Sequence, residues 1–130
     1  MISDEFAMLV SNGCVETVDG PIFCTELDWN PHAAFEGVAL KHIVTGENTA
    51  GQLSCHIVRI EPGCVLESHT HDPQWELHEV IKGSGVATVS GKESDYHPGK
   101  SSVIPSGQTH KVQAGDEGLI LLAKFFPALL

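Results

Sequence analysis

Four side chains that can bind a transition metal occur at close spacing in the second half of the chain: His69, His71, Glu76 and His110. Neutral imidazole nitrogens and a carboxylate oxygen suit divalent Fe, Mn, Ni, Cu or Zn. Because alternate residues of a β-strand share a face, His69 and His71 would point one way and Thr70 the other. The pattern therefore predicts one divalent metal ion bound on a β scaffold.

The predicted ligand set limits what such an ion could do. Three neutral imidazoles and one carboxylate would leave a divalent ion with a charge of about +1 and open positions for other molecules. An open, positively charged centre can polarise a carbonyl, bind a bidentate anion, acidify bound water or accept dioxygen. The ligands alone do not choose among these roles, and they leave the metal open among Fe, Mn, Ni, Zn and Cu.

Three further polar residues are candidates for the lining of the same site. Gln74 and His78 flank Glu76 at two-residue steps, so a regular strand would place all three on one face. His78 is predicted as a catalytic general acid or base, with a packed wall residue as the alternative. Gln74 is predicted as a substrate contact, although it could instead lie in the preceding loop. His56, in the apolar run 52–60, is a substrate-pocket candidate for which a structural role is equally open.

The elements that must position these residues are short strands separated by turns. Pro-Gly and Pro-x-Gly pairs combine a fixed proline φ with a residue that tolerates positive φ, as tight turns require. Short strands at regular spacing with such turns predict an all-β sandwich or barrel. The predicted strands are 38–44, 52–60, 65–69, 75–81, 85–90, 102–104, 110–114 and 119–125.

The first part of the chain has weaker patterns. Residues 6–10 fit either a strand or a helical turn, and Asn30-Pro31 followed by Gly37 predicts one short helix. We expect residues 1–36 to form a segment that packs on the barrel or on a partner subunit. Residues 37–130 would then form the β-barrel domain.

Two ordered motifs in this chain resemble those of the cupin superfamily. The matching positions of the first motif are Gly63, His69, His71, Glu76 and Gly83, and those of the second are Gly99, Pro105, Gly107 and His110. Ala114 stands where the family often has an asparagine that does not bind the metal. The resemblance implies an antiparallel jelly-roll β-barrel, also called a double-stranded β-helix, with the metal inside. It implies no single reaction, because cupins include dioxygenases, isomerases, lyases, decarboxylases and binding proteins.

Composition excludes several classes of partner. The chain has 7 basic and 17 acidic residues, and its formal net charge of −10 would repel nucleic acids and anionic membranes. Its acidic start lacks the positive charge of a secretory signal, and no apolar run approaches the ~20 residues of a membrane span. The 4 cysteines form no Cys-x-x-Cys pair and are expected to be free thiols. These features predict a cytoplasmic protein.

The expected function is that of a metal-dependent enzyme acting on a small polar molecule inside the barrel, with a dioxygenase as one branch. A metal-dependent isomerase or lyase is the first alternative, and a non-catalytic small-molecule-binding or sensor cupin is the second. The apolar residues 125–130 would be costly to expose, so they are expected to pack on the barrel or on a second subunit. Together with the family resemblance, this predicts a homodimer.

Overall fold

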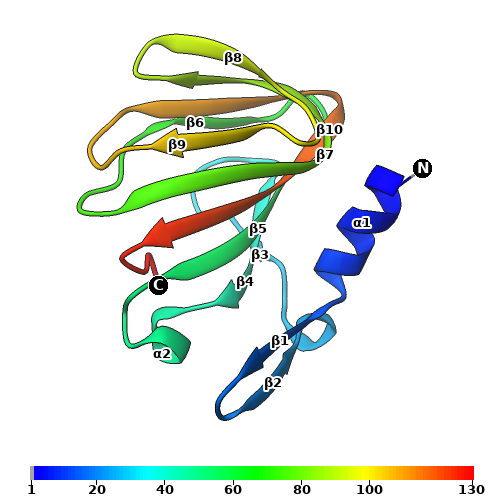
Figure 1. Ribbon diagram of the computed structural model, residues 1–130. Helices are drawn as coiled ribbons and strands as arrows, with labels where there is room; N and C mark the ends of the chain where they lie inside the picture. Colours follow the sequence, from blue (N-terminus) through cyan, green and yellow to red (C-terminus); the bar gives the residue numbers. More distant parts are fainter. Residues whose placement is uncertain (1) are drawn as a thin grey trace.

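Two long strands, β7 (Trp75–Val89) and β10 (His110–Phe126), carry the fold by pairing antiparallel along most of their length. The computed structural model describes residues 2–130 (Figure 1). The other elements, in chain order, are α1 (Ile2–Ser11), β1 (Cys14–Thr17), β2 (Gly20–Phe23), the 3-10 turn η1 (Cys24–Glu26), β3 (Asn30–Pro31), β4 (Val38–Val44), α2 (Gly46–Thr49), β5 (Ser54–Ile60), β6 (Val65–His69), β8 (Lys92–Tyr96) and β9 (Ser101–Ile104).

The main sheet follows the order β3-β4-β5-β10-β7-β8, with β6 also paired to β10 and β9 also paired to β7. The first half of β10 pairs with β6 and its second half with β5, so the strand belongs to both layers of the jelly roll. The predicted all-β antiparallel jelly roll is confirmed. In residues 2–130 the hydrogen-bond ladder stays open at β3 and β8.

Strand β7 bends at Gly83 and continues through it, where the sequence predicted a turn between two separate strands. Gly83 has φ +86°, and a Cβ built there would collide with the backbone oxygen of Gly118 in β10. The pairing of the two strands shifts register between Ala114 and Leu119, at the same crossing. The glycine that resembled a turn therefore serves a close backbone approach within a continuous strand.

The N-terminal part contains elements that sequence patterns resolved poorly. Residues 6–10 lie in the helix α1, while β1 and β2 form a separate hairpin that was not predicted. The short helix expected after Asn30 is wrong: Asn30 and Pro31 pair with β4, and His32 N–H donates to the Val38 carbonyl. A β-hairpin therefore replaces the helix. No helix within residues 2–130 is long and apolar enough to cross a membrane.

Two apolar clusters lie on opposite sides of β5. The inner cluster fills the space between the layers and includes Val58, Ile60, Leu121 and Phe125. The outer cluster packs the N-terminal segment on the sheet through residues such as Cys24, Ile43, Cys55 and Ile57, joined by Val10 and Val15. Alternate residues of β5 thus serve different clusters, as the two-residue period of a strand requires.

A buried cation strengthens the attachment of the N-terminal segment. Lys41 of β4 is 5% exposed and donates to the carbonyls of Ser11 and Cys24 at 3.2 and 3.0 Å. Its ammonium also lies 5.3 Å from the centre of the Trp29 ring. Hydrogen bonds of this kind allow a charge to be buried without a carboxylate partner.

Candidate metal centre

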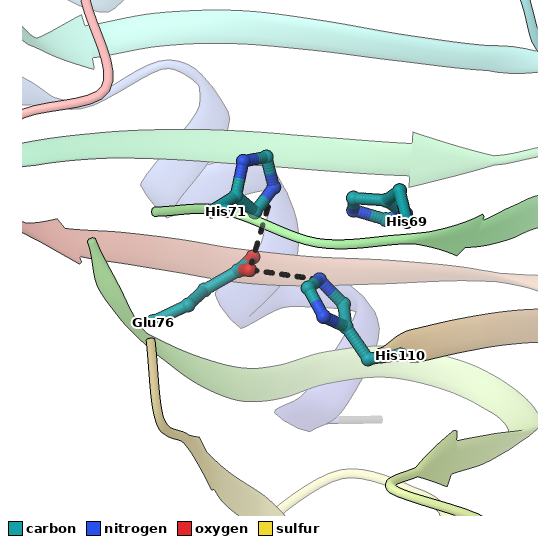
Figure 2. A group of neighbouring side chains, drawn as sticks. All are labelled: His69, His71, Glu76 and His110. Atoms are coloured by element: carbon teal, nitrogen blue, oxygen red, sulfur yellow. Dashed lines mark ion pairs between the residues drawn. The ribbon is translucent and has the colours of Figure 1, made fainter. Parts of the chain in front are cut away.

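The structure brings the four predicted ligands together at one end of the inner cavity. Each of His69, His71, Glu76 and His110 offers one ligand atom, and these atoms lie within 4.8 Å of one another (Figure 2). His69 ends β6 and pairs directly with His110, the first residue of β10. Glu76 is the second residue of β7, which pairs with β10 along its length. Strand pairing therefore gathers residues that are more than forty positions apart in sequence.

Backbone carbonyls orient two of the imidazoles. Nδ1 of His69 lies 2.6 Å from the Glu67 carbonyl, and Nδ1 of His110 lies 3.1 Å from the Gln108 carbonyl. Because a carbonyl only accepts, each Nδ1 carries the proton and donates. Each Nε2 then keeps a free lone pair, which is the form that a metal requires.

The buried ends of Glu76 and His110 leave two acceptor atoms facing each other. Glu76 Oε1 lies 3.0 Å from Nε2 of His110 and 3.8 Å from Nε2 of His71, as the dashed lines in Figure 2 indicate. Glu76 Oε1 and His110 Nε2 are buried, yet neither has a well-formed hydrogen bond. Buried polar atoms are normally satisfied, and a cation between these two would satisfy both. The donor set thus fits a divalent ion.

Burial and mutual charge set the protonation of these groups. Burial lowers the pKa of His69 to about 4, and it also lowers the pKa of His71 although Glu76 opposes it. Burial acts to lower the pKa of His110, but contacts with the Glu76 carboxylate outweigh burial and raise it. Burial acts to raise the pKa of Glu76, and the contacts with His110 and His78 lower it overall. Glu76 is therefore an anion at neutral pH.

His78 lies behind Glu76, away from the cavity. It is fully buried, its Nε2 is 2.7 Å from Glu76 Oε2, and its Nδ1 is 2.8 Å from the Tyr96 hydroxyl. The carboxylate accepts, so Nε2 donates and Nδ1 accepts from Tyr96. This arrangement holds Glu76 in place and leaves neither nitrogen of His78 for a substrate. The predicted acid or base role of His78 stays a prediction, and its position does not favour that role.

Tyr96 completes this supporting network. Burial raises the pKa of Tyr96 to about 12, with a hydrogen bond from Ser102 lowering it and the charge of Glu76 raising it. Tyr96 therefore stays a protonated phenol at neutral pH and can donate to His78. Sequence reasoning did not identify Tyr96, because β8 was not predicted and no local pattern links Tyr96 to His78, 18 residues earlier in the chain.

A cavity of about 90 Å³ opens beside His69, His71, Glu76 and His110, the group of side chains named here the metal cluster. Most of its wall is apolar and comes from the facing strands and the last residues of the chain: Leu40, Val58, Leu66, Ala123, Phe125 and Leu129. His69, His71 and Glu76 form its polar floor, and His32 is the remaining lining residue. A molecule bound here would meet His69, His71 and Glu76 on one side and apolar walls on the others.

The two predicted substrate-pocket residues lie outside this lining. The Gln74 side chain donates to the Ala128 carbonyl at 3.3 Å. His56 is fully buried, 2.7 Å from His42 through the two Nδ1 atoms and 2.9 Å from the Ser54 hydroxyl through Nε2. Contact of Gln74 or His56 with a substrate stays a prediction, which these partners do not favour.

The chain belongs to the cupin family: residues 56–124 match the cupin domain. A stretch of 63 residues, 48% of this chain, is 35% identical to the dimethylsulfoniopropionate lyase DddW of Ruegeria pomeroyi. This stretch spans only 41% of that lyase, so the likeness covers less than half of the relative.

Solved structures share the fold. A predicted oxalate decarboxylase of Thermotoga maritima superposes with a TM-score of 0.72 and 21% identity, covering 79% of this chain and 95% of that one. KdgF of Halomonas sp. gives 0.69 and 21%, covering 79% and 88%. Oxalate decarboxylase of Bacillus subtilis gives 0.69 and 26%, covering 82% of this chain but 28% of that one.

Proposed function

We propose that this cupin is a metal-dependent lyase that acts on a small carboxylate. One observation carries the proposal: three imidazoles and a carboxylate converge within 4.8 Å, with unsatisfied acceptor atoms, at the floor of a small apolar cavity. A divalent ion bound there would supply a Lewis acid for an anionic oxygen. The protein's own contribution is to fix the ligands and exclude water.

The size and lining of the cavity support a small substrate. The cavity of about 90 Å³ is roughly three times the ~30 Å³ that one water molecule takes up in the liquid, so it suits a small molecule. A short-chain carboxylic acid is a candidate of this kind. No lysine or arginine is among the residues that line it, so the metal would be the group that neutralises a negative charge.

The comparisons support the lyase branch over the dioxygenase branch. The relative with 35% identity is a lyase for dimethylsulfoniopropionate; one structural neighbour is a predicted oxalate decarboxylase, and another is an oxalate decarboxylase described with Mn(II) centres. Both named substrates are small carboxylates, and both activities remove a fragment from the acid. A metal-dependent isomerase or a non-catalytic binder would use the same cavity. Turnover distinguishes an enzyme from a binder, and the product distinguishes a lyase from an isomerase.

The test begins with elemental analysis of protein purified without chelator, expressed per chain. The protein is then loaded with that metal and incubated with oxalate, dimethylsulfoniopropionate and other short carboxylates, with products followed by NMR. We expect a metal-dependent cleavage that proceeds equally with and without dioxygen. If cleavage requires dioxygen, the proposed function changes from a lyase to a dioxygenase. Binding without any product would leave a binding protein.

A further inference from the structure

Among residues 2–130, His32 is the one polar residue that lines the cavity without belonging to the metal cluster. It lies in the loop of the hairpin formed by β3 and β4, far in sequence from the cupin motifs. Every other non-ligand residue of the lining is apolar. Recognition of a polar group away from the metal therefore depends on what the His32 ring presents.

The backbone of the loop fixes the tautomer of His32. The amides of Ala34 and Phe35 donate to Nδ1 at 3.0 and 3.2 Å. An atom that accepts two N–H groups carries no proton, so the proton of the neutral ring is on Nε2. Within residues 2–130 no group pairs with Nε2. The ring therefore presents one unused N–H donor.

The ring is also held in place. It stacks on Phe35 with ring centres 4.3 Å apart and planes 10° apart, and Phe35 packs against the inner apolar cluster. The Phe35 ring in turn lies 6.2 Å from that of His69, a member of the metal cluster. His32 N–H closes the hairpin by donating to the Val38 carbonyl at 2.8 Å. A donor fixed in this way loses little entropy on binding.

We propose that His32 donates its Nε2–H to an oxygen of the molecule held at the metal centre and so selects its substrate. This inference rests on the proposed function and narrows it. The substrate would be a short monocarboxylate or dicarboxylate with one oxygen toward the metal, a second acceptor oxygen toward His32, and an apolar remainder against Phe125 and Leu129. A hydrogen bond to a charged acceptor is worth about ten- to a hundredfold in affinity.

Two substitutions separate this role from support of the loop. In His32→Asn the short amide can still accept the loop amides near the Nδ1 position, but it has no donor at the Nε2 position. In His32→Gln the terminal amide reaches the Nε2 position as a donor, but the acceptor for the loop is lost. His97→Asn is the matched control, because His97 is exposed and outside the cavity.

Propionate and oxalate are the probes, titrated calorimetrically into each variant after loading with the metal that elemental analysis identifies. We expect His32→Asn to lose ten- to a hundredfold in affinity, His32→Gln to stay within about threefold of the unsubstituted protein, and His97→Asn to be unchanged. Equal affinity in His32→Asn, or a greater loss in His32→Gln, would overturn the donor role.

Metal content and turnover, measured on the same samples, keep the two proposals apart. If His32→Asn has normal metal content, normal turnover and unchanged affinity, the donor role of His32 is wrong and the proposed lyase activity stands. If carboxylates bind in a way that depends on His32 but no turnover is detected, the proposed lyase activity is wrong and the donor role of His32 stands. If neither probe binds the metal-loaded protein, the carboxylate class is wrong and the inference falls with it.

Discussion

Nε2 of His78 donates to Oε2 of Glu76 at 2.7 Å, while Oε1 of the same carboxylate faces the imidazoles of the metal cluster. The two oxygens of Glu76 therefore have different tasks: one is fixed by the protein interior and the other is left for a cation. Hydrogen bonds to the far side of a ligand fix its direction and tune its affinity. His78 belongs to the support of the site in this arrangement.

Replacing His78 should weaken metal binding. His78→Asn removes the Nε2 donor, so Glu76 can rotate, and the affinity for metal should fall ten- to a hundredfold, measured by competition with a chromogenic chelator. His78→Gln, which restores a donor at that position, should recover part of the loss. Wild-type affinity in His78→Asn would show that Glu76 is held by other contacts.

Removing one imidazole should empty the centre while the fold survives. His71 lies in a loop and its side chain is 21% exposed, so His71→Ala leaves no large internal cavity. We expect metal content per chain to fall sharply, by elemental analysis, with an unchanged circular dichroism spectrum. His97→Ala serves as control. Full metal occupancy in His71→Ala would show that His71 is not a metal ligand.

Stability should depend on pH through His56. Burial first, and then the neighbouring His42, lowers the pKa of His56 to about 4, below the 6.5 of an unfolded histidine. The unfolded chain thus binds the proton more readily, so stability is complete above pH 6.5 and is lost as the pH falls toward 4. The loss attributable to His56 is up to about 3 kcal/mol.

Urea unfolding between pH 7 and pH 4.5, with chelator present, measures this slope. His56→Gln cannot titrate, so its stability should fall less over the same range than that of the unsubstituted protein. Parallel slopes for the two proteins would mean that other groups carry the acid sensitivity.

The bend of β7 provides a matched pair of glycine substitutions. Gly83 and Gly91 both have positive φ, +86° and +79°, but only Gly83 faces a backbone atom, the Gly118 oxygen. Gly91→Ala should cost about 1 kcal/mol of unfolding free energy from backbone strain alone. Gly83→Ala must also separate the two strands and should cost at least about 2 kcal/mol more. Equal costs in urea unfolding would contradict the close approach.

A homodimer remains a prediction, and α1 offers a place to test it. Phe6, Met8 and Leu9 are 48%, 64% and 64% exposed, which is unusual for large apolar side chains grouped on one short helix. If a second subunit covers them, light scattering should give twice the chain mass, and Leu9→Glu should give a monomer. A monomer before substitution would contradict the dimer.

Sequence reasoning succeeded where local patterns determine the structure. The apolar run of β5 and the spacing of His69, His71 and His110 predicted the strand and the convergence of the ligands, because apolar runs and family motifs are both local signals. Local patterns do not show which partners a side chain has in the folded protein. His78 shares strand parity with Glu76, yet Tyr96 and the carboxylate take both its nitrogens. His32 carried no usable spacing, and only the hairpin brings it to the cavity.

Strand β5 has a consequence for how this protein can change. His56 and Val58 face the interior beside the metal centre, while Cys55 and Ile57 face the N-terminal segment. Neighbouring residues of β5 therefore affect different parts of the molecule. His56 and Val58 affect the surroundings of the metal cluster, and Cys55 and Ile57 affect the packing of the N-terminal segment. Substitutions at Cys55 and Ile57 could therefore change the outer cluster while the surroundings of the four candidate ligands stay the same, and substitutions at His56 and Val58 could do the reverse.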